Sequence, residues 1–360
     1  MKINSLQVVN FRKYTAKQIT FDGLVTLIHG PNGGGKTSIL EALYMASVGK
    51  SPRTNRDAVV ILHAADSASV GVDFVHRQVE QKIRLKIHRR DRKEMTLNDT
   101  PVKQKELVET LQTIFFGPDD IQLVKGGPQP RRRFLDLSLA RANPLYYDAL
   151  LRYNRVLAQR NRCLKIGDES SAYGWDEQLA QQAAYITAAR LSAMDAWNRR
   201  LQEVITEISD TKTEMSLRYL RPYAAQDDPD TESYRQMLAA SRERDMRYGY
   251  TSVGPHRGDW RLERDTWDMA RYGSQGEQRL AVLALKLCEI DFLQEQTGER
   301  PILLLDDVLS ELDKRRRLAF LAWIDAHRIQ MIITGTDIPR ELEGKMQQIE
   351  LDGEGDGTME

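Results

Sequence analysis

Apolar positions in the first third of the chain follow the two-residue repeat of β-strands. The alternation is clearest over residues 70–75 and 83–87, and the short apolar run over residues 25–29 has the length of a buried strand. Residues 38–45 instead repeat apolar side chains at every third or fourth position, which predicts a helix. We therefore predict a mixed α/β segment in which the strand over 25–29 leads directly into this helix.

The middle of the chain has a helical pattern. Turn residues cluster over 117–130, and the helical pattern over 131–167 is broken mainly at Asn143-Pro144. Residues 175–208 then predict a single long helix, roughly 50 Å at about 1.5 Å per residue, that projects or packs as an antiparallel pair. A loop at residues 227–230 and a helix over 234–244 follow, and α/β character returns from residue 250.

The segment between the first two predicted elements is a complete phosphate-binding loop. Its spacing, G-x-x-x-x-G-K-T, lets backbone N–H groups face phosphate oxygens, while Lys36 reaches the β and γ phosphates and Thr37 offers its hydroxyl to Mg²⁺. A plain glycine-rich turn is the alternative, but the strand before it and the helix after it favour an anion site at a helix N-terminus. The predicted ATP-binding residues are Gly30, Pro31, Asn32, Gly33, Gly34, Gly35, Lys36, Thr37 and Ser38.

A carboxylate pair, Asp306-Asp307, closes the apolar run over residues 302–305. We predict that Asp306 shares the Mg²⁺ with Thr37, through water, and that Asp307 orients or deprotonates an attacking water. Together with Lys36, these two residues form the predicted catalytic set. Helix-capping carboxylates after a buried strand are the structural alternative.

The two halves of this site lie about 270 positions apart, yet their chemistry requires them side by side. We therefore predict one head built from the N- and C-terminal segments, with the helical block inserted between them. The predicted boundaries are 1–127 for the N-terminal part of the head, 128–249 for a helical arm and 250–360 for the C-terminal part.

Composition leaves the partner open. Lys plus Arg and Asp plus Glu number 52 each, so a polyanion would have to be met by local patches of charge. Cys163 and Cys288 are far apart, and the six histidines lack ligand spacing, so neither a disulfide framework nor a metal beyond Mg²⁺ is indicated. Without a signal peptide or a run of about 18 apolar residues, we predict a cytoplasmic protein with no membrane partner. The aromatic residues are expected in the core and not as base-stacking platforms.

A second anion site is predicted where Ser274 and Gly276 begin a helix that continues through residue 285. Because one chain holds one triphosphate, the second site suggests a clamp on nucleotide held by another copy. The segment Ser274-Gln275-Gly276-Glu277-Gln278-Arg279 resembles the signature of ABC-type ATPases, although Gln275 and Glu277 depart from the transporter form Leu-Ser-Gly-Gly-Gln. The alternative is an ordinary capped helix. The predicted contacts to nucleotide are Ser274, Gly276 and Glu277.

Several further motifs together resemble the RecF family of bacterial recombinational repair proteins, over nearly the whole chain. They lie at residues 9–14, 50–54, 118–120, 125–128, 131–136 and 306–313. Two departures are local: Gly258 stands where the family usually has Asp, and Lys13 where it has Asn. Gly258 has no carboxylate to supply in place of that Asp.

The resemblance implies an ABC-type ATPase head related to SMC and Rad50 proteins. It implies a DNA-binding ATPase whose ATP-bound form dimerises on DNA, acts at single-strand/double-strand junctions in the nucleoid and cooperates with RecR and RecO to load RecA. It also implies that Arg12 contacts nucleotide phosphates and that Asp119, with Asp120, lies in a loop that senses the γ phosphate.

Basic clusters offer phosphate contacts without base readout. The candidates for DNA binding are Arg53, Arg56, Arg89 and Arg90, although a solvated face is the more common structure for any single basic cluster. Hydrolysis is expected to be slow, because Gly335-Thr336 follow the strand over 330–334 where many relatives have a histidine, and Asp307 is one methylene shorter than the usual Glu.

Three other functions compete with this interpretation. The ATPase subunit of a membrane transporter would need a shorter helical insert and usually that histidine. An SMC-like structural DNA tether would need a far longer heptad arm. A phosphotransferase would need an acceptor site, for which the sequence shows no motif.

Overall fold

The computed structural model describes residues 1–209, 214–220, 230–336, 344 and 346–351. The chain forms two compact units: residues 1–119, 207–209 and 293–360 make the first, and residues 120–206 and 210–292 make the second. Residues 250–292, which the sequence analysis assigned to the head, therefore belong to the second unit. The predicted boundary at residue 128 lies close to the change of unit at residue 120.

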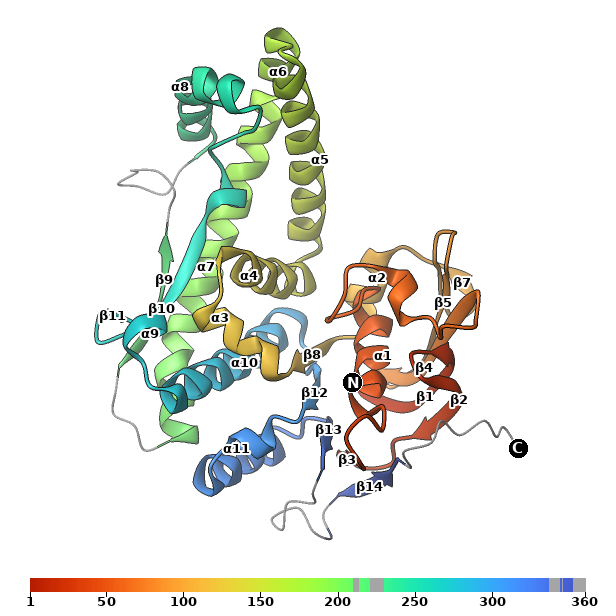
Figure 1. Ribbon diagram of the computed structural model, residues 1–360. Helices are drawn as coiled ribbons and strands as arrows, with labels where there is room; N and C mark the ends of the chain where they lie inside the picture. Colours follow the sequence, from red (N-terminus) through yellow and green to blue (C-terminus); the bar gives the residue numbers. More distant parts are fainter. Residues whose placement is uncertain (210–213, 221–229, 337–343, 345, 352–360) are drawn as a thin grey trace. The chain divides into compact units, whose positions relative to one another are not determined.

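The centre of the first unit is a parallel sheet that interleaves the two ends of the chain. Its strand order is β14-β3-β13-β12-β8, and every neighbouring pair is parallel (Figure 1). The strands are β3 Val25–His29, β8 Thr113–Phe116, β12 Ile302–Asp306, β13 Met331–Gly335 and β14 Gln347–Glu350. The prediction of one mixed α/β head made from N- and C-terminal segments is confirmed.

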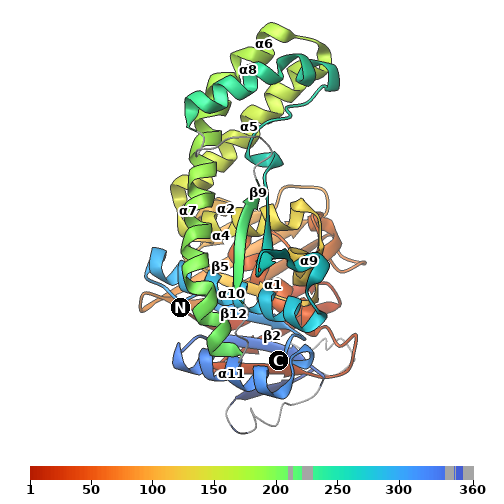
Figure 2. The ribbon, with the colours of Figure 1, turned by 90° about the vertical axis from the view of Figure 1, so that its left-hand side faces the viewer.

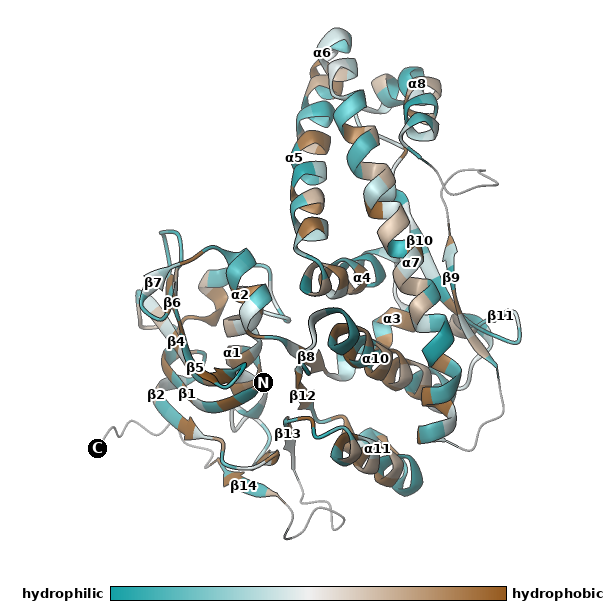
Figure 3. Cartoon of the chain, turned by 180° about the vertical axis from the view of Figure 1, so that it is seen from behind, coloured by the Kyte–Doolittle hydropathy of each residue, from teal (hydrophilic) through white to brown (hydrophobic). Residues whose placement is uncertain are grey.

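Helix α1 Lys36–Val48 follows β3 and packs on β8, β12 and β13. All its residues from Ser38 to Val48 are buried, and Glu41 is the one charged residue among them. The apolar run of β12 is buried from Ile302 to Leu305, as parallel strands covered on both faces require (Figure 3, brown). This packing holds the phosphate loop at the carboxyl edge of the sheet.

An antiparallel sheet completes the first unit, in the order β2-β1-β4-β5-β6-β7. Its strands are β1 Lys2–Phe11, β2 Tyr14–Thr20, β4 Ser67–His76, β5 Val79–His88, β6 Glu94–Leu97 and β7 Thr100–Pro101. The register aligns Val8 with Val70 and Val70 with Leu85, so one face carries a continuous apolar row. The remaining elements of this unit are η1 Asp57–Val60, α2 Gln104–Thr110, η2 Pro118–Ile121, η4 Leu309–Glu311 and α11 Lys314–Ala326.

The second unit is mainly helical, as predicted. The helices are α3 Gln122–Lys125, α4 Pro128–Ala142, α5 Pro144–Ile166, α6 Glu169–Gly174, α7 Asp176–Ile208, α8 Thr231–Tyr248, α9 Met269–Tyr272 and α10 Gln275–Thr297 (Figure 2). Asn143 ends α4 and caps α5, where its side chain accepts hydrogen bonds from the N–H groups of Leu145 and Tyr146. Of the predicted loop at 227–230, residues 227–229 lie outside the described residues.

The second unit also contains a three-stranded antiparallel sheet, whose first strand the sequence analysis missed. Its order is β11-β10-β9, with β9 Met215–Leu220, β10 Asp259–Arg264 and β11 Trp267–Asp268. The alternation of buried Met215 and Leu217 with more exposed Ser216 and Arg218 was the available signal. A six-residue strand is short beside the long helix that precedes it, so the helical pattern dominated the prediction.

Buried ion pairs tie the elements of the second unit together. Arg160 of α5 is fully buried and donates to Asp176 and to Asp245, in each case at 2.8 Å. Arg190 of α7 donates to Asp136 of α4 at 2.7 Å and to the carbonyl of Pro255 at 2.7 Å. Breaking such a pair would leave a buried charge unpaired, so each one fixes the relative position of its elements. No helix in the described part of the chain is long and apolar enough to span a membrane.

Candidate functional site: the phosphate loop and its surroundings

Two glycines allow the loop after β3 to take its shape. Gly30 has φ 144°, and a Cβ there would collide with the backbone carbonyl of Leu351. Gly35, with φ 91°, is the N-cap of α1, and a Cβ there would collide with the hydroxyl of Tyr14. The Tyr14 hydroxyl donates to the Gly34 carbonyl at 3.2 Å, and burial raises the pKa of Tyr14 to about 12. The loop is thus held tightly from the β2 side while its N–H groups stay at the start of the helix.

The predicted catalytic lysine lies within this loop. The Lys36 ammonium donates to the carbonyls of Gly30 at 2.7 Å and Pro31 at 3.0 Å. Lys13 donates to the carbonyl of Gly33 at 3.3 Å. Two cations therefore flank the loop, and both are within reach of an anion cradled by its backbone.

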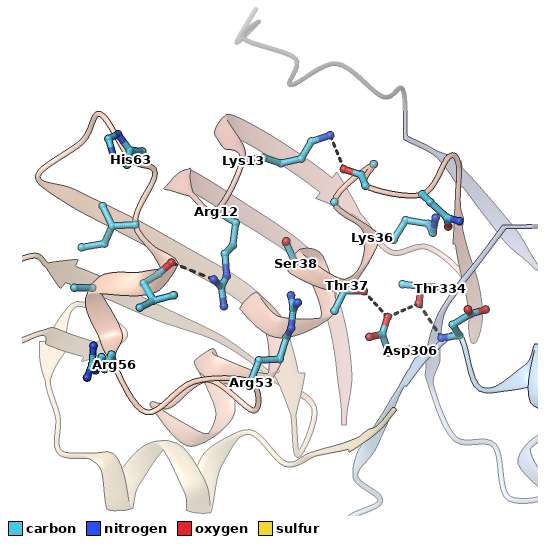
Figure 4. A pocket seen from close by; sticks show the side chains of 18 of the residues that line it. Arg12, Lys13, Lys36, Thr37, Ser38, Arg53, Arg56, His63, Asp306 and Thr334 are labelled. Carbon is cyan, nitrogen blue, oxygen red and sulfur yellow. Dashed lines mark hydrogen bonds between the residues drawn. The ribbon is translucent and has the colours of Figure 1, made fainter. Parts of the chain in front are cut away.

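The structure brings Asp306 and Thr37 together. The Thr37 hydroxyl donates to Asp306 Oδ1 at 2.8 Å, and Thr334 at the end of β13 donates to the same oxygen at 2.8 Å (Figure 4). A hydroxyl and a carboxylate are oxygen ligands of the kind that Mg²⁺ takes, together with phosphate oxygens and water. In the described part of the chain, no three His, Cys, Asp or Glu side chains gather as ligands, so a cation here would draw its other ligands from phosphate and water.

Asp307 lies beside this pair in a backbone conformation that is uncommon for residues other than glycine. Its φ is 55°, and its N–H donates to the Thr334 hydroxyl at 3.1 Å. Asp tolerates the left-handed region better than most residues, but a strained residue at a ligand site commonly serves to aim its side chain. The exposed Asp307 lines the same cavity as Lys36.

Sequence reasoning missed Glu41, a fully buried carboxylate on α1. Arg12 makes a bidentate pair with it, at 2.8 Å from Nε and 2.5 Å from Nη2, and the Ser51 hydroxyl donates to it at 2.5 Å. Arg53 lies 3.7 Å from the same carboxylate. Glu41 therefore holds two segments, residues 9–14 and 50–54, that the resemblance had picked out separately. A lone charge in an apolar helix was the signal that could have found it.

A cavity of about 930 Å³ extends from the loop across these residues. The phosphate loop, Asp306, Asp307 and Thr334 line one part, and Arg12, Arg53, Arg56, His63 and Arg89 line another (Figure 4). Arg89 is also a brace, because it donates to the carbonyls of Leu62, His63 and Ala65. Three of the four arginines predicted to bind DNA thus lie in the wall of the nucleotide cavity, whereas the exposed Arg90 does not line it.

Asp119 does not line this cavity. It is exposed in η2, three residues after β8 ends at Phe116, which pairs with Leu305 directly before Asp306. Its neighbour Asp120 forms an ion pair with Lys286 at 3.0 Å in the second unit. The structure therefore places Asp119 near the same sheet edge as Asp306 but outside the cavity wall.

The predicted clamp residues lie in the second unit and do not line the cavity either. Ser274 and Glu277 form a capping box at the start of α10: the Ser274 N–H donates to the Glu277 carboxylate at 2.8 Å, and the Glu277 N–H donates to Ser274 Oγ at 3.3 Å. The hydrogen bond from the Ser274 backbone lowers the pKa of Glu277, and Arg264 pairs with its carboxylate. The local structure is that of a capped helix, with Gly276 in its first turn.

Comparison with known proteins identifies relatives over nearly the whole chain. The sequence model of the RecF/RecN/SMC N terminal domain matches residues 2–348. The DNA replication and repair protein RecF of Clostridium novyi (strain NT) is 35% identical over 94% of this chain and 94% of its own length. The protein of the same name from Halothermothrix orenii (strain H 168) is 37% identical over 94% of this chain and 92% of its own length.

Solved structures give the same result. The recombination mediator protein RecF-ATPrS of the RecFOR pathway superimposes with a TM-score of 0.88 at 30% identity, covering 98% of this chain and 96% of that one. RecF-ATP of the same pathway gives 0.87 at 31% identity, covering 94% and 93%. An Smc head bound to the C-winged helix domain of ScpA gives 0.54 at 17% identity, covering 94% and 90%, which shows a shared fold alone.

Proposed function

The chain belongs to the RecF family, and from this premise we propose that it is an ATP-dependent DNA-binding protein of recombinational repair. The contact that carries the proposal is the hydrogen bond between Thr37 and Asp306, which joins residues 269 positions apart into one nucleotide site. The cavity of about 930 Å³ lies within the roughly 300–1,000 Å³ range of small-molecule sites. Solved relatives named RecF-ATP support ATP as the ligand.

In this proposal, different residues of the first unit have different roles in ATP binding and hydrolysis. The loop N–H groups and Lys36 bind the phosphates, and Thr37 with Asp306 would hold Mg²⁺, which supplies charge neutralisation on the phosphate oxygens. Asp307 orients the attacking water. Arg12, Arg53 and Arg56 share the cavity with Lys36, so their charge acts first on the nucleotide and only secondarily on DNA.

We propose weak hydrolysis that serves as a conformational switch. Among the described residues, none forms a hydrogen bond with the carboxylate of Asp307, so nothing holds its side chain against the water. The exposed Thr336, where many relatives have a histidine, is a poorer proton carrier. A steady-state rate at the upper part of the roughly 1–10³ s⁻¹ range of ordinary enzymes would contradict a switch.

We also propose that ATP drives dimerisation on DNA. The N-terminus of α10, where Ser274 and Gly276 lie, carries the positive end of a helix dipole, which favours an anion such as the triphosphate held by a second copy. Duplex DNA and single-strand/double-strand junctions are the proposed substrates, with Arg90 as a phosphate contact outside the cavity. By relation to RecF proteins of the RecFOR pathway, RecR and RecO are the proposed partners in RecA loading in the cytoplasm, at the nucleoid.

The decisive experiment measures molar mass in solution by light scattering, with and without ATP, Mg²⁺ and DNA. The wild type should become a dimer with ATP, and Lys36→Ala should stay a monomer because it loses nucleotide binding. Ser274→Asp is the sharper variant: Asp is a good N-cap, so α10 keeps its start, but its charge repels a triphosphate from another copy.

Ser274→Asp should therefore bind ATP as the wild type does and fail to dimerise, and Ser274→Arg should fail in the same way by its bulk. A Ser274→Asp protein that still dimerises would remove Ser274 from the interface. A wild-type protein that stays monomeric with ATP and DNA would contradict the dimer altogether.

A further inference from the structure

Two stacked tyrosines stand exposed where α8 ends. Tyr248 is 58% exposed and Tyr250 is 40% exposed, with ring centroids 5.8 Å apart and planes inclined by only 20°. Gly249 between them ends α8 with φ 69°, a left-handed turn that places both rings on one side. Packing in the core of the unit does not explain two large aromatic side chains that contact each other and remain exposed. We call these two residues with Arg244 and Ser252 the tyrosine face.

The tyrosine face lines a cavity of about 490 Å³ in the second unit. Arg244 is its one charged lining residue, and none of its lining residues is acidic. Two further arginines lie close by: Arg257 stacks its guanidinium on the Tyr250 ring, 4.6 Å from the centroid, and the exposed Arg247 lies in the last turn of α8. The surroundings are therefore aromatic and cationic, which favours an anionic ligand with flat rings.

Buried polar groups hold Ser252, one of the residues that line the cavity. Ser252 donates to the fully buried Asp245 from its N–H at 3.0 Å and its hydroxyl at 2.6 Å, and Asp245 is paired with Arg160. The Ser252 hydroxyl in turn accepts from Arg244 Nε at 2.9 Å. This bond orients the Arg244 guanidinium, so its terminal N–H groups are positioned before any ligand arrives.

These features fit a single strand of DNA better than a small molecule. A small-molecule site usually buries about 70–90% of its ligand, whereas these rings stand open to solvent, so a chain can pass over them. Proteins that bind single strands without sequence preference combine aromatic rings, on which successive bases stack, with arginines along the backbone. Duplex DNA is excluded from stacking in this way, because its bases are already stacked on one another.

We propose that the tyrosine face binds single-stranded DNA, with a base stacked on the exposed Tyr248 ring, Tyr250 and Arg257 extending the stack behind it, and phosphates held by Arg244 and Arg247. The proposal rests on the proposed function and deepens it, because it assigns the single-stranded side of a junction to the helical unit. It also departs from the sequence-based expectation that the aromatic residues belong to the core.

The test measures binding of the full-length protein to a fluorescently labelled oligothymidylate by anisotropy, and to a duplex in parallel. The double variant Tyr248→Ala/Tyr250→Ala should weaken single-strand binding by at least about 10-fold, since each stacked base contributes strongly. Tyr248→Phe/Tyr250→Phe keeps the rings and should stay within about 2-fold of the wild type. Duplex and ATP binding should be unchanged in both.

Tyr185→Ala is the matched control, because it removes another exposed tyrosine of the same unit, 38% exposed on α7. Its single-strand affinity should equal that of the wild type. Ultraviolet cross-linking of the oligothymidylate should attach it to Tyr248 or Tyr250, as found by peptide mass spectrometry. Circular dichroism of the alanine variant checks that the helical unit still folds, and the cross-link in the wild type tests the site without any substitution.

Unchanged single-strand affinity in the double alanine variant, or cross-links elsewhere only, would overturn the proposal. A wild-type protein that binds duplex DNA but no single-stranded DNA would also overturn the tyrosine-face proposal, but it would leave the proposed function intact. A wild type that binds no DNA of any kind, with ATP present, would overturn the proposed function as well. If the double alanine variant lost binding to a protein partner but kept full affinity for single-stranded DNA, the tyrosine face would be assigned to protein recognition instead.

Discussion

At the scale of single residues, Glu41 anchors the residues around the nucleotide cavity, although none of the predicted motifs singles it out. It is buried on α1, the helix that follows the phosphate loop, and accepts hydrogen bonds from Arg12 and Ser51. Ser51 in turn accepts from the N–H groups of Arg53 and Thr54. The arginine wall of the nucleotide cavity therefore depends on one carboxylate that itself never faces the ligand.

Glu41→Gln tests this dependence. The substitution keeps the shape but removes the charge, leaving the Arg12 guanidinium without its ion-pair partner, so the free energy of unfolding should fall by about 3 kcal/mol. ATP affinity should fall as well, because Arg12 and Arg53 lose their anchor. Urea unfolding and fluorescent-nucleotide binding measure the two effects.

The control is Glu94→Gln, which removes a carboxylate that is 66% exposed and pairs with His88 on the surface. Its unfolding free energy should change by no more than about 0.5 kcal/mol. If the Glu41→Gln variant proved as stable as this control, Glu41 would not be the anchor of the wall.

At the scale of elements, His256 joins the short helix η3 Pro255–Arg257 to α5. Its Nδ1 lies 2.5 Å from the Tyr153 hydroxyl, and its Nε2 lies 3.0 Å from the Thr251 carbonyl. Nε2 must carry the proton to donate to that carbonyl, so Nδ1 accepts from Tyr153. Burial lowers the pKa of His256 to about 4, because the charged ring would lose its hydration.

The buried position of His256 predicts that the free energy of unfolding depends on pH. An unfolded histidine takes up its proton near pH 6.5, whereas His256 in the folded chain does so only near pH 4, so stability is present above pH 6.5 and is lost as the pH falls toward 4. The loss should reach about 3 kcal/mol. Chemical unfolding of wild type and His256→Gln at matched pH values measures it.

Carboxylates also titrate between pH 6.5 and 4. The informative quantity is therefore the difference in unfolding free energy between the wild type and His256→Gln at each pH. His256→Gln should be less stable than the wild type at pH 7.5, and the gap should narrow or reverse near pH 4.5. Parallel pH curves for the two proteins would show that His256 is not the group responsible.

At the scale of the whole molecule, the two ends of the chain build one sheet. In the order β14-β3-β13-β12-β8, β3 is separated from β8 by two strands from the C-terminal segment, and it also pairs with β14 on its other side. Neither end can form the nucleotide site alone.

Truncation tests this interleaving. A chain ending at residue 292 lacks β12, β13 and β14, so β3 and β8 lose their neighbours and Thr37 loses Asp306; ATP binding should be abolished. A chain ending at Leu351 keeps all described strands and should bind ATP like the full-length protein. Nucleotide binding by the shorter chain would contradict a head built from both ends.

The sequence by itself determined the features that depend on local spacing. The phosphate loop from Gly30 to Thr37, the apolar strand before Asp306, the break at Asn143 and the long helix over 175–208 all follow from neighbouring residues, and the structure confirms each element. Pairing Thr37 with Asp306 was also predictable, because the chemistry of Mg²⁺ requires both.

Only the tertiary structure decided which distant side chains share a surface. The sequence does not show that Arg53, Arg56 and Arg89 line the nucleotide cavity, that Glu41 anchors Arg12, or that Tyr248 and Tyr250 face solvent. These outcomes depend on how strands and helices far apart in the chain pack. The local sequence around an arginine or a tyrosine does not show whether the side chain lines a cavity, faces solvent or lies in the core. Local patterns encode elements because neighbours interact along the backbone, whereas a site is made by contacts that exist only after the chain has folded.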